Sequence, residues 1–388
     1  MGTTTAKPVS FTNSRASVLL DLLRALAAFL VLLSHWKIMF FVDYPQIPAH
    51  KWLFAVPYVL GSAGHQSVLI FFVLSGYLIS GSVFRSIDGG FWRWRTYLTH
   101  RFVRLYVVLI PGLLFCAACD WIGLHFAHTP DLYNGVSAKT HLIDVGQTLT
   151  LPAFLGNLAF VQTIFVPTFG SDGALWSLAN EFWYYILFPL GWFAIRRGTG
   201  IPQRVAFAVL FCGIAWMTRS SILLLFPVWL AGTLLALLPP PRVGRAFRAS
   251  ASVVYVLAIF LFSKGQFLPG VVHDYLFGAI TFFYIWVLLS AREAAGNSRY
   301  VHWTRQGARF SFSLYVVHMP LLLLLTAFVA GDRLWVPTRP GTDAVSLLIL
   351  GLLMLAAYGF GWLTEFRTDK VRRWVEAQLD IVFSERLP

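Results

Sequence analysis

The feature that most constrains this chain is a series of apolar runs, many of them long enough to cross a lipid bilayer as helices. Such a helix needs about 20 predominantly apolar residues. The ten candidate runs are residues 17–39, 63–83, 102–122, 174–195, 204–217, 221–238, 250–263, 272–290, 310–330 and 346–363. The chain is 57% hydrophobic and only 12% charged, which excludes a soluble, disordered, collagen-like or disulfide-stapled protein. We therefore expect an all-α integral membrane protein with a bundle of about ten transmembrane helices.

The distribution of Lys and Arg predicts the orientation of these helices, because the cytoplasmic loops of membrane proteins collect basic residues. With a cytoplasmic N-terminus, most of the 30 Lys and Arg residues fall in inner segments. The outer segments contain Lys37, Lys51, Lys139, Arg219, Lys264, Arg333 and Arg339. We therefore place both termini in the cytoplasm and the protein in the inner (plasma) membrane. Residues 1–366 form one membrane domain in this interpretation, and residues 367–388 form a cytoplasmic tail.

One further apolar stretch, residues 149–167, would place every later Arg cluster outside if it crossed the membrane. We interpret it as an interfacial or re-entrant part of an outer loop. The net charge of +13 follows from the loop residues, so we expect no nucleic-acid partner. The cysteines, Cys116, Cys119 and Cys212, lie in apolar runs, which argues against a disulfide framework and against a metal site.

The first apolar run contains three ionisable residues, Asp21, Arg24 and His35. Ionisable groups within a bilayer are costly and commonly mark a functional site. Arg24 and His35 lie within about 20° of each other around a helix and about 16 Å apart along it, so they share one face. Asp21 can pair with Arg24 on that face. A neutral imidazole, with an ordinary pKa near 6.5, suits a general base. The alternatives are an arginine that reaches the inner headgroups and a histidine that bonds a helix carbonyl.

Two later runs place further polar groups inside the membrane. In the fourth run Glu181 lies among aromatic residues, so it must be protonated, paired or exposed to water. In the ninth run Ser311, Tyr315 and His318 follow the spacing of one helical face. For both runs the alternative is a structural hydrogen bond between helices.

A basic cluster precedes the third apolar run and includes Arg101 and Arg104. We expect these two residues on the opening turn of a helix, where free backbone N–H groups and the helix dipole also favour an anion. A phosphate would fit there. The alternative is that this cluster only sets the topology and contacts lipid headgroups.

Together these residues resemble the acyltransferase-3 family of multi-pass membrane O-acyltransferases, which often modify sugars. The similar blocks are Asp21 to His35, Phe71 to Ser80, Arg101 to Arg104, Leu175 to Glu181 with Tyr184 and Pro189, and Ser313 to Pro320. These blocks follow one another in the same order as in the family, and together they span most of the chain. One departure is Val107, where the family usually has a proline.

The resemblance implies transfer of an acyl group, commonly acetyl, from cytosolic acyl-CoA to a hydroxyl at the outer face. It assigns CoA binding to Arg101 and Arg104, with Arg24 beside the acyl donor, and general-base catalysis to His35. We expect Glu181 to orient or re-protonate that imidazole. A catalytic role is also open to Arg24. The expected substrate-binding residues are Ser75, Tyr77, Trp176, Tyr315 and His318.

Two questions stay open from the sequence. Direct transfer and an acyl-histidine intermediate are both compatible with His35. The competing function is a secondary transporter that uses the intramembrane Arg, Glu and His as a substrate or proton pathway. The absence of an inverted repeat argues against a transporter. The expected partners are acyl-CoA, a saccharide or lipid-linked saccharide acceptor, and the bilayer.

Overall fold

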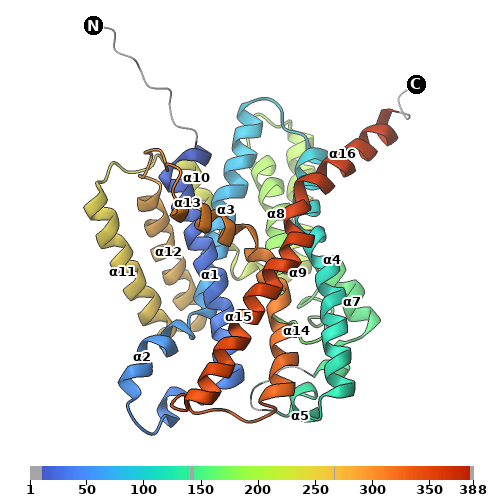
Figure 1. Cartoon of the computed structure of the whole chain (residues 1–388). Helices are drawn as coiled ribbons and strands as arrows, with labels where there is room; N and C mark the ends of the chain where they lie inside the picture. Colours follow the sequence, from blue (N-terminus) through green and yellow to red (C-terminus); the bar gives the residue numbers. More distant parts are fainter. Residues whose placement is uncertain (1–10, 138, 140–143, 266, 385–388) are drawn as a thin grey trace.

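The computed structural model describes residues 11–137, 139, 144–265 and 267–384, and all regular elements within them are helices (Figure 1). The longer helices are α1 (Arg15–Phe40), α3 (Gly64–Asp88), α4 (Trp94–Phe126), α8 (Trp176–Ile195), α9 (Ile201–Leu223), α10 (Phe226–Leu237), α11 (Arg245–Ser263), α12 (Gly270–Leu288), α14 (Ser311–Val329), α15 (Pro340–Leu363) and α16 (Thr368–Ser384). The shorter helices are α2 (Lys51–Leu60), α5 (Pro130–Tyr133), α6 (Val145–Thr148), α7 (Leu151–Leu158) and α13 (Arg299–Arg309). Single 3₁₀ turns occur at η1 (Phe11–Asn13), η2 (Tyr44–Gln46), η3 (Gly173–Leu175) and η4 (Glu365–Arg367).

Eight helical stretches are long and apolar enough to cross a membrane. They are Arg15–Phe40, Lys51–Asp88, Trp94–Phe126, Ile201–Arg219, Arg245–Ser263, Gly270–Leu288, Ser311–Val329 and Pro340–Ile381. The two other predicted runs correspond to α8 and α10. Helix α8 has 20 residues, but several of them are polar or aromatic with polar atoms. Helix α10 has 12 residues and rises only about 18 Å, which is shorter than the hydrocarbon core.

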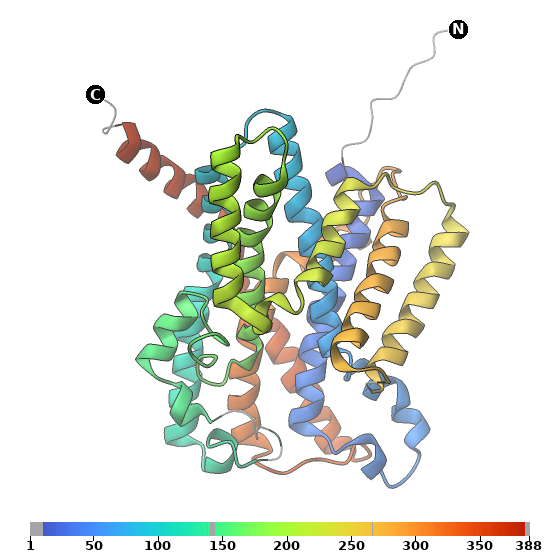
Figure 2. The same cartoon turned by 180° about the vertical axis from the view of Figure 1, so that it is seen from behind.

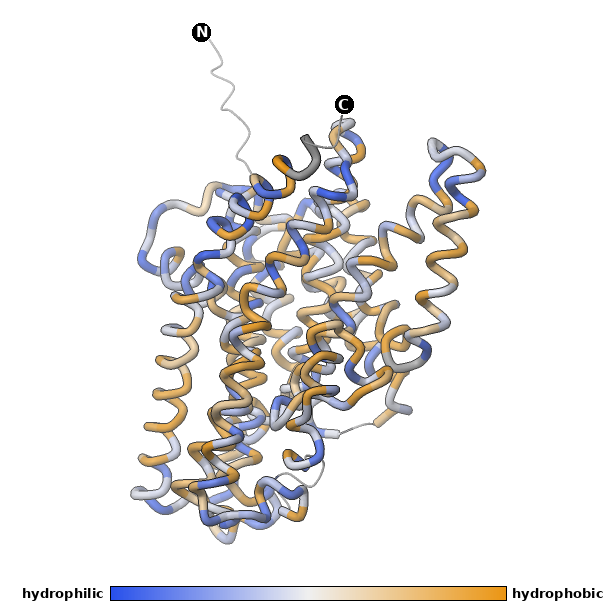
Figure 3. The backbone as a smooth tube through the Cα atoms, turned by 90° about the vertical axis from the view of Figure 1, so that its right-hand side faces the viewer, coloured by the Kyte–Doolittle hydropathy of each residue, from blue (hydrophilic) through white to orange (hydrophobic). Residues whose placement is uncertain are grey.

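The bundle has one end that is rich in arginine, which we name the basic end. Figure 1 shows α1, α4 and α11 beginning, and α3 and α12 ending, at the same end as α16. The connecting segments there contain Arg93, Arg196, Arg242 and Arg292. Figure 3 shows hydrophobic residues through the middle of the bundle and hydrophilic residues gathered toward its two ends. Both ends of the described chain therefore lie on one side of an apolar layer.

The crossing of α3 and α10 explains why glycine follows Ser75 in the second apolar run. A Cβ at Gly76 would lie 2.0 Å from the carbonyl oxygen of Trp229, and one at Gly232 would lie 2.0 Å from that of Val73. The two backbones are in direct contact at these glycines. This contact holds α3 at the depth at which Ser75 faces the interior of the bundle.

The segment between α4 and α8 contains no helix long enough to cross a membrane in its described part. Helix α7 has eight residues and rises about 12 Å. The chain then returns toward α8, and the indole N–H of Trp183 donates to the carbonyl of Phe160 at 2.8 Å. Figure 2 shows this segment gathered beside the half of α4 that lies away from the basic end.

The predicted C-terminal tail, residues 367–388, forms helix α16 over its described part and packs along α4. The ring of His100 lies 2.7 Å from a carboxylate oxygen of Glu376, and Arg95 pairs with Asp380. The tail is therefore attached to the helix that contains the predicted anion-binding arginines.

Candidate active site

A cavity lies among α1, α3, α4, α8 and α14, and we name it the membrane cavity. The empty space among these helices, counted together with the open mouth of the cavity, is about 960 Å³. Its polar lining residues are Arg24, Ser75, Arg101, Arg104, Ser177, Glu181, Tyr185, Ser311 and Tyr315. Most of the site residues expected from the sequence therefore meet around one cavity.

A second cavity opens at the basic end, and we name it the basic cavity. It is lined by Asp21, Arg24, His100, Arg101, Arg104, Arg305, Ala308, Arg309, Glu365, Phe366, Thr368, Asp369 and Arg372. Arg24, Arg101 and Arg104 line both cavities. A ligand with a phosphorylated head and a thin arm could therefore contact the same three guanidiniums on its way from one cavity to the other.

Three arginines that were not predicted as site residues also line the basic cavity, namely Arg305, Arg309 and Arg372. Arg305 and Arg309 lie four residues apart and so share one face of α13, which is a signal that was present in the sequence. Arg372 had no such signal, because its position depends on the docking of α16.

The expectation that Arg101 and Arg104 lie on an opening helical turn is wrong. Helix α4 begins at Trp94, so both residues lie about two turns or more inside it. Their backbone N–H groups are occupied by the hydrogen bonds of the helix. Anion binding at this place therefore depends on the guanidinium groups and not on the helix terminus.

The predicted pair between Asp21 and Arg24 is present, with a guanidinium nitrogen 3.7 Å from a carboxylate oxygen. Both side chains are mostly buried, at 20% exposure for Arg24 and 25% for Asp21. The pair lies where the two cavities meet, and it keeps the arginine charge compensated in the absence of a ligand.

Glu181 lies at the centre of a hydrogen-bond network within the membrane cavity. Its Oε1 accepts from the hydroxyl of Ser75 at 3.1 Å and from the hydroxyl of Tyr185. The indole N–H of Trp229 donates to Ser75 in turn, at 3.2 Å. No hydrogen bond joins Glu181 to His35 among the described residues. The structure therefore pairs this carboxylate with hydroxyl groups instead of the imidazole that we expected it to orient.

The hydrogen-bond partner of His35 is His318. Nδ1 of His35 lies 2.9 Å from Nε2 of His318, and the two rings stack at a centroid distance of 5.0 Å. Nδ1 of His318 lies 2.8 Å from the carbonyl oxygen of Tyr315 and 3.1 Å from that of Leu314. Because a carbonyl only accepts, this Nδ1 bears the proton, and Nε2 of a neutral His318 is an acceptor.

This pattern determines the tautomer of His35. Its Nδ1 must donate to His318, so its Nε2 is left with a free lone pair. That Nε2 has no hydrogen-bond partner within the part of the chain that the structure describes. His35 is thus an imidazole whose basic nitrogen is oriented and unoccupied, as a general base requires.

Tyr315 separates the membrane cavity from the histidine pair. Its hydroxyl lies 2.6 Å from that of Ser177 and donates to the carbonyl of Ala174 at 2.8 Å. Its ring lies 5.9 Å from the ring of His318, centroid to centroid. The cavity therefore ends about one aromatic ring away from the imidazole pair.

Three of the expected substrate-binding residues, Tyr77, Trp176 and His318, do not line the membrane cavity. Tyr77 is on α3 and its ring meets that of Phe11, at a centroid distance of 6.2 Å. Trp176 begins α8 and stacks on His65 at 6.5 Å, while the edge of Phe72 meets it at 6.3 Å. Because α3 begins at Gly64, Trp176 lies toward the opposite end of the bundle from Arg101.

Glu365 is a residue of the site that sequence analysis missed. Its carboxylate accepts from the backbone N–H of Ser313 at 2.9 Å and from the Ser313 hydroxyl at 2.8 Å. The first turn of α14 has no side-chain cap of its own, so Glu365 satisfies one of its free N–H groups from another helix. Glu365 also lines the basic cavity. It therefore connects the C-terminal region to the helix that contains Tyr315 and His318.

The comparisons with known proteins agree with this geometry. A family model described as an acyltransferase domain, that of the acyltransferase-3 family, matches residues 18–365. Neither a curated protein nor a solved structure matches the chain significantly. The matched range contains every residue that lines the membrane cavity and both histidines of the pair. The chain therefore belongs to the acyltransferase-3 family of multi-pass membrane acyltransferases.

Proposed function

We propose that this protein transfers an acetyl group from cytosolic acetyl-CoA to a hydroxyl of a saccharide or saccharide-containing acceptor at the opposite face of the membrane. The proposal depends most on one observation. The basic cavity and the membrane cavity share Arg24, Arg101 and Arg104, and Tyr315, which lines the membrane cavity, contacts His318 of the His35–His318 pair.

The basic cavity has side chains suited to bind the phosphates of CoA. Arginine forms planar, charge-assisted and often bidentate hydrogen bonds with phosphate. Six arginines line this cavity, namely Arg24, Arg101, Arg104, Arg305, Arg309 and Arg372. Three carboxylates line it as well, so the arginines remain in excess. We infer that the phosphates bind there and that the pantetheine arm enters the membrane cavity toward the histidines, about 16 Å from Arg24 along α1.

The reaction that we infer is direct acyl transfer with His35 as general base. Nε2 of His35 takes the proton of the acceptor hydroxyl while that oxygen attacks the thioester carbonyl. The tetrahedral intermediate then collapses, the C–S bond breaks, and the CoA sulfur leaves with the proton that His35 returns. His318 holds the His35 tautomer, the role that the sequence analysis had given to Glu181. We infer that Glu181, with Ser75 and Tyr185, positions the acyl arm.

The orientation of the protein follows from the basic end. Because Lys and Arg collect in cytoplasmic loops, we propose that this end faces the cytosol of an inner (plasma) membrane, which is where acyl-CoA is available. The acceptor hydroxyl then approaches from the opposite end, where Trp176 and His65 stack.

The test is the thermal stability of the detergent-purified protein with and without acetyl-CoA. A ligand that binds only the folded state raises its unfolding temperature. We expect this rise in the wild type and in His35→Ala, and its loss in Arg101→Ala/Arg104→Ala. The matched control is Arg196→Ala/Arg197→Ala, which removes the same charge at the same end outside both cavities. If no short acyl-CoA stabilises the wild type, the proposal is wrong, and the secondary transporter becomes the better explanation of the intramembrane charges.

A further inference from the structure

A third cavity at the basic end is separate from the candidate active site. It lies among α1, α11, α12 and α13, and we name it the three-arginine pocket. Its lining residues are Arg15, Val18, Leu19, Arg245, Arg248, Ala249, Ser252, Leu288, Ala291, Ala295, Ser298, Tyr300 and Val301. None of them lines the membrane cavity or the basic cavity. The acyl-transfer proposal therefore leaves this pocket without a role.

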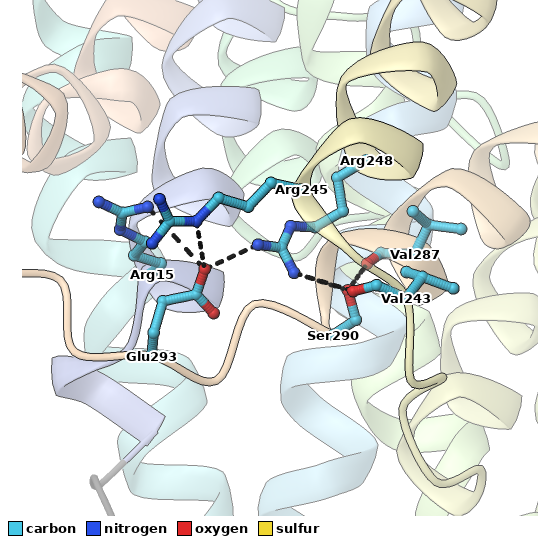
Figure 4. A network of polar contacts seen from close by, with 7 residues as sticks. All are labelled: Arg15, Val243, Arg245, Arg248, Val287, Ser290 and Glu293. Carbon is cyan, nitrogen blue, oxygen red and sulfur yellow. Dashed lines mark hydrogen bonds and ion pairs between the residues drawn. The ribbon is translucent and has the colours of Figure 1, made fainter.

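The arginines of the pocket surround a single carboxylate, that of Glu293 (Figure 4). Arg248 is the anchor: its side chain is 12% exposed, and its Nη2 donates to Oε1 of Glu293 at 2.7 Å. Its Nη1 lies 3.3 Å from both the hydroxyl of Ser290 and the carbonyl of Val243. The position of Arg248 is therefore determined by contacts on two sides.

The other two arginines, Arg15 and Arg245, have N–H groups that donate no hydrogen bond to a described residue. A nitrogen of Arg15 and one of Arg245 each lie 3.8 Å from Oε1 of Glu293, which is an ion-pair distance but too long for a hydrogen bond. Neither side chain makes a hydrogen bond among the described residues. Each guanidinium has five N–H donors, and these two side chains are 47% and 76% exposed. They are available to a ligand at the mouth of the pocket.

The electrostatics of the pocket favour an anion. Three guanidiniums face one carboxylate, so the cluster has an excess of two positive charges. Helix α11 begins at Arg245 without a side-chain cap, whereas α13, whose first residues also line the pocket, is capped by Ser298. Helix N-termini add partial positive charge and free N–H groups to such a site.

Several of the residues around the pocket are apolar, as expected of a site that contacts lipid. Val18, Leu19 and Leu288 form an apolar wall below the arginines. The neighbouring helix α11 exposes Val253 at 61% and Leu257 at 61%, as expected of a helix face in contact with acyl chains. Because α1 and α11 begin at this end of the bundle, the arginines lie at the level where headgroups meet the apolar layer.

We propose that the three-arginine pocket binds the headgroup phosphate of an anionic phospholipid, whose acyl chains lie along the apolar face of α11. A phosphate diester accepts the free donors of Arg15 and Arg245, and the net negative charge of the lipid balances the excess positive charge. A zwitterionic lipid has the same phosphate but no net charge. The ligand is therefore distinguished by charge as well as by shape.

The experiment is native mass spectrometry of the full-length, delipidated protein, titrated with phosphatidylglycerol or phosphatidylcholine in the same detergent. The variant is Arg15→Gln/Arg245→Gln, and the control Arg196→Gln/Arg197→Gln removes equal charge at the same end. We expect the wild type and the control to bind phosphatidylglycerol equally, and the variant to bind it at least about tenfold more weakly, since two charge-assisted hydrogen bonds are removed. Phosphatidylcholine should bind weakly to all three.

Several results would overturn the proposal. One is equal binding of phosphatidylglycerol by the variant and the wild type, and another is equal weakening by the control, which would indicate a diffuse surface charge. A third is equal binding of the two lipids. Displacement of phosphatidylglycerol by millimolar inorganic phosphate would assign the pocket to a soluble phosphate and reject the lipid. Because both substituted side chains are exposed and each loses only a long ion pair with Glu293, the unliganded variant should unfold close to the wild-type temperature, and acyl transfer plays no part in the readout.

Discussion

The pairing of His35 with His318 predicts how activity responds to the loss of the residue that fixes the tautomer of His35. In His318→Leu the Nδ1–H of His35 loses its partner inside the bundle. An unpaired buried donor costs about 1–3 kcal/mol, which favours the other tautomer of His35 by about 5- to 150-fold. That tautomer has its proton on Nε2 and cannot act as the base there. We expect kcat to fall by about 10- to 100-fold, with the affinity for acetyl-CoA unchanged.

The assay is transfer of radiolabelled acetyl from acetyl-CoA into membranes of the native cells, with acetyl-CoA affinity measured separately by calorimetry. His318→Gln is the matched variant, because a glutamine oxygen near the position of Nε2 can still accept from His35. It should retain more activity than His318→Leu. Equal losses in the two variants, or full activity in His318→Leu, would refute the tautomer argument. A parallel loss of acetyl-CoA affinity would show that the substitution disturbs the fold instead.

Three other predictions test separate parts of the structure. Arg309→Gln should weaken acetyl-CoA binding about five- to tenfold in calorimetry through the loss of one contact with phosphate, whereas Arg197→Gln should leave it unchanged. Gly76→Val should abolish the folded protein in size-exclusion chromatography, because the added carbons would overlap the Trp229 carbonyl 2.0 Å away. Burial, and next the charge of a nearby aspartate, raise the pKa of Asp172 well above its ordinary value. A carboxyl whose folded-state pKa is raised destabilises the fold as pH rises above the unfolded pKa. Asp172→Asn should therefore raise the unfolding temperature at pH 7, and this gain should shrink as the pH is lowered toward 4.

Much of the candidate site followed from local sequence pattern. Arg24 and His35 share a face because of helical periodicity alone, and the pair of Arg24 with Asp21 follows from their separation of three residues. The cost of charge in a bilayer then indicated that these residues belong to a site. Arg101 and Arg104 line both cavities, but their helix begins earlier than expected, at Trp94.

Contacts between distant parts of the chain could not be predicted in this way. His35 and His318 are 283 residues apart, and their hydrogen bond depends on the packing of α1 against α14. Glu181 was paired with the wrong partner, because rotation of α8 within the bundle directs its carboxylate toward Ser75 of α3. No local pattern in the sequence encodes that rotation.

The sequence by itself determined that this chain forms apolar helices with a basic end, and which residue types lie within the apolar layer. These properties depend on free energies of transfer and on helical periodicity, which act on each segment separately. The tertiary structure decided which of the polar faces meet, how the cavities join at three arginines, and which nitrogen of His35 is free. These properties depend on side-chain packing between helices, such as the contact of Gly76 with Gly232, and packing is a property of the whole bundle.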